Sequence, residues 1–494
     1  QLLAKTNNIT MQTPPQYFLG RFIEAGQSDM IIRWVQDEIQ NTKPYDAVII
    51  STDMLAYGGL VESRWPTVSE TLAKARLDSL KKIKQNNKTT KVFAFATLMR
   101  IAPTSTDTNE DWIRVLIRYT QMQEQYRKTG YSHYWYRMDE LKDRVPEDVL
   151  NAYFSARKRN FAVIKHLIDM VARGEIDELI IGTDDAQEVS PQAREKVELR
   201  SYAREKKVLD RIFFCEGADQ LANLQLSKYV IELYGYTPKV NYRVSNPSAL
   251  FQAAAYESIP LKDSIETQII ASGGEVTYDS KQADYTLYVY TPGTEKKLYD
   301  AFVYLLLNDL KQNRPVAIAD INFRERSDAH KHLFTDIMEH KYIDRLYGYA
   351  AWNTASNTIG TSIPHGNLFV IAKKNGLSIE SQKAHFEFLL HRILNDVLYH
   401  DVVRPGAYAI IDNHQSANRN HVRGTAFDSL QEWVSQETAK KLNVLFENYF
   451  RGMEIKSENG KFKVSGLKDV SVSLPWPRAF ESKVEFELVI QRED

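Results

Sequence analysis

The sequence predicts an α/β fold of the (β/α)₈ barrel type with a small β-rich unit at its C-terminal end. Six short apolar runs each resemble a strand buried on both faces, and most of them precede a long helical pattern, as in a parallel sheet covered by helices. Polar side chains cluster where the runs end, which is where α/β folds bind their ligands. The runs are DAVIISTDMLAYGG (46–59), KVFAFATLMR (91–100), ELIIGTDDAQ (178–187), RIFFCEGADQ (211–220), PVAIADINFR (315–324) and YGYAAWNTASNTIG (347–360).

Predicted helices separate the strands in the first half of the chain. A helix near 28–41 precedes the first strand, and a helix near 69–85 leads to the second. The long helical region 110–174 predicts an insertion that caps one face of the sheet. After the third strand, Ser190 and Pro191 have the residue types preferred at the N-cap and at the first position of a helix.

The second half of the chain continues the alternation and then changes character. Two further strands are expected at 239–245 and 283–292, with a helix near 262–272 between them. A long amphipathic helix at 379–403 follows the last strand of the series. Beyond residue 406, the segment SENGKFKVSGLKDVSVSLPWPRAFESKVEFELVIQ alternates polar and apolar residues with period two, which is typical of half-exposed antiparallel strands.

The number of strands bears on the choice between two architectures. If only one of the strands 239–245 and 283–292 belongs to the barrel, the count is one short of eight, and a first strand missing from this chain would make up the difference. A doubly wound open parallel sheet needs no missing strand and is the alternative. The barrel is preferred because nearly every strand has a polar end, whereas an open sheet would concentrate polar ends at one point. The expected domains are residues 1–405, a barrel-like catalytic domain with a helical insertion near 104–174, and residues 406–494, an α+β accessory unit.

Composition limits the classes of partner. Lys and Arg number 63 and Asp and Glu 64, which gives a formal net charge of -1, so neither nucleic acid nor an anionic membrane surface is expected as a partner. The chain has no run of about 18 apolar residues, so no membrane-spanning helix is expected. The single cysteine, Cys215, cannot form an internal disulfide, which favours a reducing compartment or a bacterial protein that makes little use of disulfides, and a cytoplasmic location is expected. The sequence begins at Gln1 without the regions of a signal peptide, but removal of an upstream segment stays open. It gives no indication of the oligomeric state.

Several motifs, in a fixed order, together resemble the bacterial domain-of-unknown-function family 4127. They are STDMLAYGGLVESR, FATLMRIAP, the R-x-RN of Arg157, Arg159 and Asn160, GTDDAQ, the EGAD of Glu216 to Asp219, AAWNTASNTIGT, HRILNDVLYHDVVR and SLPWPRAFE. The resemblance covers nearly the whole chain. It also implies an initial strand ending in Asp-x-Arg-Pro, which this chain lacks, in agreement with a missing first strand. The family name implies no activity, so the function must be inferred from the residues.

The adjacent pair Asp184 and Asp185 is the sharpest local signal. Two carboxyls at a strand end can diverge, so that one has a raised pKa and acts as an acid while the other stays charged. Glycoside cleavage requires this division of roles. The pair is similar to that of barrel hexosaminidases, in which the first Asp orients the substrate's 2-acetamido group and the second protonates the leaving oxygen. The alternative is that one Asp caps the following helix or turn and only its neighbour faces a ligand.

The segment AAWNTASNT suggests a sugar site. Trp352 could stack on a pyranose face, and the amides of Asn353 and Asn357 each offer a donor and an acceptor to vicinal hydroxyls. In the structural alternative, Asn353, Thr354 or Ser356 caps a helix and Trp352 belongs to the core.

Three further strand ends supply candidates for substrate binding. These are Asp53, Arg100 and Asp320. Asp53 could bind substrate hydroxyls, but it could also pair with Arg64 or Arg100. The alternatives stay open at the level of sequence.

Glu216 and Asp219 flank Gly217, where a tight turn allows close approach of the backbone. Glu216 is the candidate for a further catalytic carboxylate and Asp219 for substrate binding, although either could be the second catalytic group. An ion pair with Arg157 or Arg159 is the competing explanation.

Metal and nucleophile motifs are weak in this sequence. Its histidines form no HExxH, and the H-x-H of His330 and His332 falls in an expected loop or helix, where such residues are more often on the surface than ligands. No metal ligand and no cofactor is therefore expected, although Asp53, Asp184 and Asp320 could form a carboxylate-only Mg²⁺ or Ca²⁺ site. G-x-S-x-G, P-loop and G-x-G-x-x-G motifs are lacking. The sequence thus predicts a glycoside hydrolase or related carbohydrate-active hydrolase acting on a small-molecule or oligosaccharide substrate, with a 2-acetamido sugar as a candidate. The alternatives are a metal-dependent hydrolase and a non-catalytic sugar-binding protein.

Overall fold

The computed structural model describes residues 1–41, 44–101, 103–104, 110–322, 328–414, 418–458 and 460–493. The chain forms two compact units, each assembled from separate segments. The N-terminal unit comprises Gln12–Gln225 and Ala253–Thr267. The C-terminal unit comprises Gln1–Met11, Leu226–Gln252 and Gln268–Asp494.

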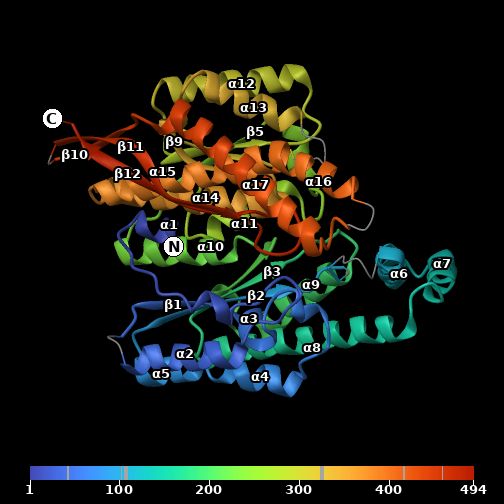
Figure 1. Ribbon diagram of the computed structural model, residues 1–494. Coiled ribbons are helices and arrows are strands. Elements are labelled where there is room, and N and C mark those ends of the chain that lie inside the picture. Colours follow the sequence, from blue (N-terminus) through green and yellow to red (C-terminus); the bar gives the residue numbers. More distant parts are fainter. Residues whose placement is uncertain are drawn as a thin grey trace. The chain divides into compact units, whose positions relative to one another are not determined.

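The N-terminal unit contains a four-stranded parallel sheet with the order β1-β2-β3-β4 (Figure 1). Its strands are β1 (Ala47–Ser51), β2 (Lys91–Leu98), β3 (Glu178–Thr183) and β4 (Ile212–Glu216). Every residue of β3 is buried, as expected for a strand covered on both faces. Because all four strands run in the same direction, their carboxyl ends lie along one edge of the sheet.

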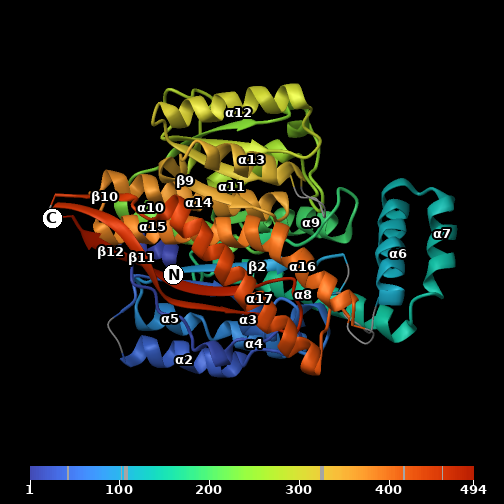
Figure 2. The same ribbon diagram turned by 45° about the horizontal axis from the view of Figure 1, so that its top comes forward.

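Helices connect these strands and cover them. They are α2 (Ser28–Asn41), α3 (Thr52–Tyr57), α4 (Glu70–Asp78), α5 (Lys81–Asn86), α6 (Glu110–Thr129), α7 (Ser132–Lys142), α8 (Glu147–Ala172) and α9 (Pro191–Glu205), with short 3₁₀ turns at Gln16–Phe18, Glu62–Arg64 and Leu209–Arg211. The predicted helical region is thus three helices. In both views α6 and α7 lie side by side near one end of α8, where Tyr119 of α6 contacts Phe154 of α8 (Figures 1 and 2). The Ser190 hydroxyl accepts from Ala193 N at 3.3 Å, so the predicted N-cap is confirmed.

The C-terminal unit contains a five-stranded parallel sheet with the order β6-β5-β7-β8-β9. Its strands are β5 (Lys239–Val244), β6 (Glu275–Val276), β7 (Tyr285–Tyr290), β8 (Val316–Asp320) and β9 (Leu346–Ala351). Numbered within the unit, the order is 2-1-3-4-5, which is an order of doubly wound sheets. Both β5 and β7 enter the sheet and pair with each other, so the strand count that used only one of them was too low.

The remaining helices belong wholly or partly to the C-terminal unit. They are α1 (Leu2–Lys5), α10 (Leu221–Tyr234), α11 (Leu261–Ala271), α12 (Lys296–Lys311), α13 (Asp328–Glu339), α14 (Ala355–Lys374), α15 (Ile379–Arg392), α16 (Arg404–Asp412) and α17 (Gly424–Leu445), with π-helical segments η6 (Ile393–Val403) and η7 (Phe446–Phe450) and 3₁₀ turns at Pro247–Phe251 and Ile343–Arg345. The predicted helix 379–403 therefore changes to π geometry at Ile393.

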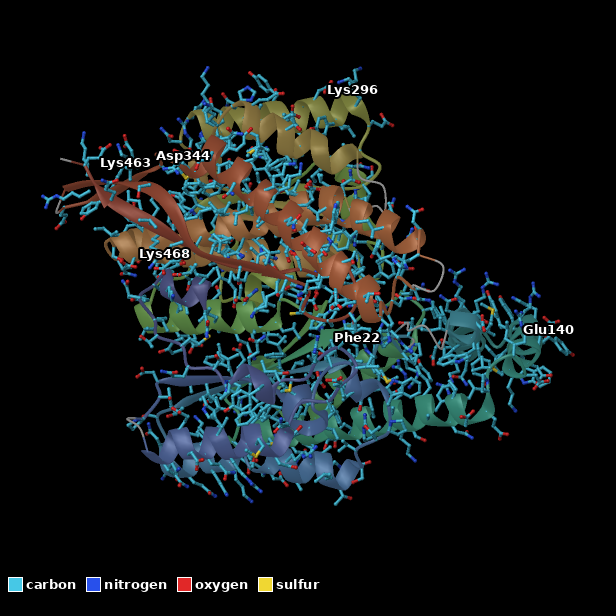
Figure 3. All side chains as sticks on the ribbon, viewed as in Figure 1. Phe22, Glu140, Lys296, Asp344, Lys463 and Lys468 are labelled. Atoms are coloured by element: carbon cyan, nitrogen blue, oxygen red, sulfur yellow. The ribbon has the colours of Figure 1, made fainter. Side chains whose placement is uncertain are left out.

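An antiparallel sheet ends the chain, as the period-two pattern predicted. It consists of β10 (Glu454–Ser457), β11 (Gly460–Ser473) and β12 (Lys483–Arg492), in that order. Lys463 and Lys468 of β11 form ion pairs with Glu493 and Glu487 (Figure 3). Alternate residues face the core, where Val464 and Leu488 are fully buried.

The antiparallel sheet shares its hydrophobic core with the five-stranded sheet. Val464 and Leu488 belong to the same apolar cluster as Tyr288 and Ile318 of the parallel strands and Leu442 of α17. The compact units therefore divide the chain differently from the predicted boundary after residue 405. The molecule is an α/β protein with parallel sheets and a small antiparallel C-terminal sheet.

Candidate functional site

The carboxyl edge of the four-stranded sheet brings together charged side chains from separate strands. Asp53 lies in the first turn of α3, directly after β1, and Arg100 follows β2. Asp184 and Asp185 follow β3, and Asp219 lies in the loop after β4. The parallel strands thus place these residues along one edge of the sheet, and their role in a common site stays a prediction.

A glycine permits the close contact between the ends of β3 and β4. A Cβ atom on Gly182 would lie 2.6 Å from both Gly217 O and Leu221 Cδ1, so a side chain does not fit there. Gly217 N also donates to Thr183 O at 2.9 Å. The loop that carries Asp219 is therefore held beside the start of the Asp184–Asp185 turn.

The Asp184–Asp185 turn has a strained backbone. Asp185 has φ +29°, a value that residues with a Cβ rarely adopt. Gln192 Nε2 donates to the carbonyl oxygens of Asp184 and Asp185, at 3.2 and 2.9 Å, and Ala186 N donates to Tyr256 O at 2.9 Å. Such conformations cost about 1–3 kcal/mol and persist where surrounding contacts hold them, which occurs often at functional sites.

Each carboxylate of the pair has its own arginine. Arg64 donates to Asp184 Oδ2 at 2.8 Å and also bonds Thr104, whereas Arg100 forms an ion pair with Asp185. The side chains of the first pair are 6% and 12% exposed, and those of the second are 31% and 20% exposed. The Arg100–Asp185 pair is therefore the one that is more open to a ligand.

Two carboxyls at this edge titrate near neutral pH. Burial raises the pKa of Asp53 to about 7, although hydrogen bonds from Thr97 oppose the shift. Burial also raises the pKa of Asp185 to about 6, with Arg100 acting in the opposite direction and the charges of Asp184 and Asp219 adding to the shift. Perturbed pKa values of this kind are typical of acid–base sites.

Glu216 is buried among donors. Its Oε1 accepts from the Ser258 hydroxyl at 2.9 Å and forms an ion pair with Lys196, and its Oε2 accepts from Ser258 N at 2.8 Å. The expected alternative of an ion pair was correct in kind, but the partner is a lysine of α9 rather than Arg157 or Arg159. These contacts fasten the segment 253–267 to β4, and a catalytic role of Glu216 stays a prediction.

Arg157 of α8 supports the loop that carries Arg100. Its Nη2 donates to Met99 O and to Arg100 O, at 2.7 Å each, and its Nη1 donates to Glu195 Oε2 at 2.9 Å. Tyr153, one turn earlier, donates to Ile101 O at 2.9 Å. The arginine therefore fixes the backbone of this loop.

Arg159 and Asn160 support the loop that carries Arg64. Arg159 Nη2 and Asn160 Nδ2 both donate to Ser63 O, at 2.6 and 2.9 Å, and Arg159 Nη1 donates to Trp65 O at 2.9 Å. The R-x-RN motif is visible in the sequence, but its role in holding this loop was not predicted. The only sequence signal was the presence of two arginines and an asparagine within one turn of a helix.

The remaining predicted site residues belong to the C-terminal unit. Trp352 directly follows β9, has φ +48° and is 8% exposed. Its ring stacks on His400 with centroids 3.4 Å apart, and the Arg404 guanidinium lies 4.0 Å from its centroid. These contacts occupy much of the ring surface that a sugar would need.

Asn353, Asn357 and Asp320 take part in local hydrogen bonds. Asn353 Oδ1 accepts from Thr354 N at 2.8 Å and from Asn357 Nδ2 at 3.1 Å, at the start of α14. Asp320 Oδ1 accepts from Asn322 N at 3.1 Å. The N-cap of α14 is Thr354, and its side chain makes no capping hydrogen bond, so the helix-capping alternative stays a prediction. The sugar-binding roles of these residues stay predictions, as does their meeting with residues of the N-terminal unit.

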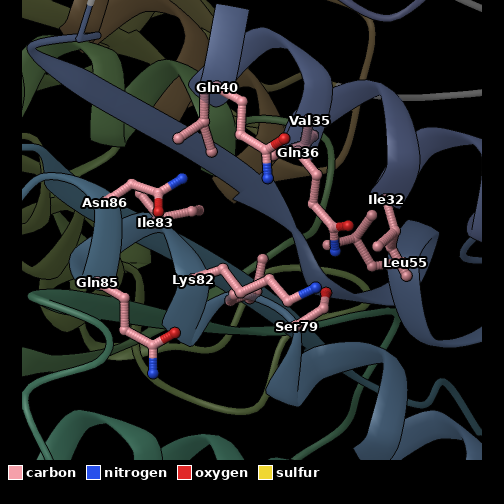
Figure 4. A pocket seen from close by; sticks show the side chains of 12 residues that line it. Ile32, Val35, Gln36, Gln40, Leu55, Ser79, Lys82, Ile83, Gln85 and Asn86 are labelled. Carbon is pink, nitrogen blue, oxygen red and sulfur yellow. The ribbon is translucent and has the colours of Figure 1, made fainter.

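Two cavities in the N-terminal unit are lined by other residues. One of about 260 Å³ lies between α2 and α5, with an apolar floor including Ile32, Val35 and Ile83 and a rim of amides (Figure 4). Another of about 200 Å³ lies between α6, α8 and α9 and includes Arg157 and Glu195. Neither contains the aspartates of the candidate site.

Within the described residues, neither a cluster of metal ligands nor a membrane-spanning helix is found. There, no three His, Cys, Asp or Glu side chains are placed to hold one metal ion. In the same part of the chain, no helix combines the length and the apolar character needed to cross a membrane.

Comparison with known proteins identifies the family. Neither the curated proteins nor the solved structures include a significant match. The family model described as "Protein of unknown function (DUF4127)" matches residues 1–485, which confirms the resemblance seen in the motifs. The chain therefore belongs to the DUF4127 family.

Proposed function

We propose that the N-terminal unit hydrolyses glycosidic bonds at the carboxyl edge of its sheet, with Asp185 as the general acid. One observation carries the proposal, which is the contrast between two adjacent carboxyls. Each is paired with an arginine, but the Asp185–Arg100 pair is more exposed than the Asp184–Arg64 pair, and burial raises the pKa of Asp185 to about 6. A carboxyl with such a pKa holds a proton for part of the time near neutral pH and can give it to a leaving oxygen.

Asp184 orients the attacking group in this proposal. Its ion pair with Arg64 and the Gln192 hydrogen bond to its carbonyl fix its position. A carboxylate fixed in this way suits either attack on the sugar or orientation of a 2-acetamido group that attacks in its place. A 2-acetamido sugar is accordingly the substrate class that we propose.

The neighbouring polar groups bind the sugar hydroxyls. Asp53, whose pKa is about 7, offers both a donor and an acceptor when protonated. Arg100 and Asp219 contribute charged groups near Asp185. Glu216 acts in this proposal as an anchor for the segment 253–267, because Lys196 and Ser258 already engage its two oxygens.

Three finer predictions accompany the proposal. The first is closure of the parallel strands into a (β/α)₈ barrel. The 2-1-3-4-5 strand order of the five-stranded sheet argues against this closure and favours the alternative, a doubly wound open sheet. Sugar binding by Asp320, Trp352, Asn353 and Asn357 is the second. Cytoplasmic residence, inferred from the single Cys215, is the third.

A panel of nitrophenyl glycosides, including the 2-acetamido sugars, tests the function. We expect hydrolysis of at least one substrate by the full chain, and we expect the rate to survive EDTA because neither protonation nor attack requires a metal. An exposed carboxyl of the same unit, altered in Asp210→Asn, provides a control that should keep full activity.

Two results would favour the alternatives. Activity that EDTA abolishes and Mg²⁺ or Mn²⁺ restores would indicate a metal-dependent hydrolase. Saturable binding of a sugar without turnover of any substrate would indicate a sugar-binding protein.

A further inference from the structure

The cavity between α2 and α5 in the N-terminal unit combines an apolar floor with a polar rim. We call it the α2–α5 cavity, and its volume is about 260 Å³. One face of α2 forms one side, and α5 with the residues just before it forms the facing side (Figure 4). Sites for drug-sized ligands have volumes of about 300–1,000 Å³, so this cavity suits a smaller ligand.

Aliphatic side chains from both helices form the floor. Ile32, Val35 and Ile39 lie at positions i, i+3 and i+7 of α2 and therefore share one face of the helix. All three are partly buried and pack against the core of the unit. On the facing side, Leu80 and Ile83 are 2% exposed each. An alkyl chain in the cavity would remove the remaining apolar surface of the α2 side chains from water, which is favourable by about 25 cal/mol per Å².

Four amides and one ammonium group line the rim. Gln36 and Gln40 belong to α2, and Lys82, Gln85 and Asn86 belong to α5. Among the residues that the structure describes, no side-chain hydrogen bond or ion pair engages any of these five groups. Amides and an ammonium group supply several N–H donors. These donors are therefore available to the polar end of a ligand.

The charge of the lining is positive. Among the described residues that line the cavity, Lys82 is a cation and none is an Asp or Glu. With 3.6 residues per turn, Asp37 and Glu38 of α2 lie away from the cavity face, and Glu38 accepts from a tyrosine hydroxyl at 2.5 Å. Asp29, in the first turn of α2, accepts from Arg76 at both oxygens, at 3.0 Å each. The lining therefore complements a negatively charged group and offers no partner to an amine.

We propose that the α2–α5 cavity binds a short aliphatic carboxylate, of the class to which octanoate belongs. The alkyl chain lies on the aliphatic floor, and the carboxylate accepts a charge-assisted hydrogen bond from Lys82 and further hydrogen bonds from the rim amides. A free amino acid is a poorer match, because its ammonium group would find no carboxylate. A helix of a protein partner, about 10–12 Å across with its side chains, is too large for the cavity. This site is independent of the proposed hydrolase function.

Calorimetric titration of the full chain with sodium octanoate tests the proposal. We expect saturable binding at one site, and octylamine, with the same chain and the opposite charge, should bind far more weakly. Lys82→Gln should weaken octanoate binding by about tenfold or more, because a hydrogen bond to a charged group is lost. Lys81→Gln, at a neighbouring exposed lysine that does not line the cavity, should keep it. Absence of saturable binding, equal affinities of the two lysine variants, or equal binding of octylamine would overturn the proposal.

A pair of tryptophan variants tests where octanoate binds. Gln36→Trp places a large ring at the rim of the cavity and should abolish the binding, whereas Asp37→Trp, at an exposed position on the other side of α2, should keep it. Circular dichroism checks that both variants are folded. Equal affinities of these two variants for octanoate would show that the ligand binds elsewhere and would also overturn the proposal.

Discussion

At the scale of single residues, neighbours in the sequence have different chemical environments. The sequence pointed to Asp184 and Asp185 as a pair, because adjacent carboxyls at a strand end are suited to divided roles. Their partners could not be recognised. Arg64 lies 120 residues before Asp184, and only the folded sheet brings the two within 2.8 Å. The positive φ of Asp185 also has no signature in its residue type.

The raised pKa of Asp53 predicts how stability depends on pH. An aspartate titrates at about 3.9 in an unfolded chain, against about 7 in the fold, so the folded state binds more protons between these values. Stability from this group is therefore highest at low pH and falls as pH rises through this window, by up to about 4 kcal/mol. Urea unfolding at pH 5 and pH 8 measures the fall, which should be smaller in Asp53→Asn and unchanged in Asp210→Asn. An equal fall in all three proteins would contradict the assignment.

At the scale of helices and strands, the order of elements was largely predictable, whereas their connections were not. Buried apolar runs indicated the long strands, and the period-two pattern indicated the antiparallel sheet. The strand β6 has two residues, which are too few to show a periodic sequence pattern. Its place beside β5 nevertheless gives the five-stranded sheet the strand order of a doubly wound fold. The change to π geometry at Ile393 was equally hidden, since the helical periodicity continues through it.

The contacts of Arg157 in α8 predict that substitutions can change the stability and the activity of the protein independently. Arg157→Met leaves Glu195 buried without its partner and should lower the unfolding free energy by about 3–5 kcal/mol. Replacing both residues, with Arg157→Met and Glu195→Leu, should recover much of this loss because no charge stays buried alone. The double variant should still have a lower kcat, since the Arg100 loop has lost its support from Arg157. Urea unfolding and steady-state kinetics measure both quantities, and full activity in the double variant would show that Arg157 does not position the site.

At the scale of the whole molecule, segments that are distant in the sequence belong to the same compact unit. The predicted boundary after residue 405 followed a change in pattern, but compactness follows shared cores, and the chain contributes three segments to the C-terminal unit. Single-sequence patterns report local periodicity and burial, and they contain no information on which distant segments share a core. The gathering of the strand ends at one edge could be predicted, because parallel strands place their carboxyl ends together.

Because the C-terminal unit is built from three separate segments, we expect a fragment that lacks one of them not to fold. Residues 268–494 lack β5, which pairs with both β6 and β7 in the five-stranded sheet. The apolar β7 would then be an exposed edge, so we expect the fragment to aggregate or to remain unfolded. Circular dichroism and urea unfolding measure this. A soluble fragment that unfolds cooperatively would contradict the division.

The kinetics of Asp185→Asn test the proposed general acid most directly. The variant should slow glycosides with poor leaving groups by about 10²-fold or more, because they require protonation, and should spare activated aryl glycosides, which need little. Asp184→Asn should slow both classes, since orientation of the attacking group matters for any leaving group. Small and equal effects of both substitutions on both classes would contradict the account and show that the pair is structural.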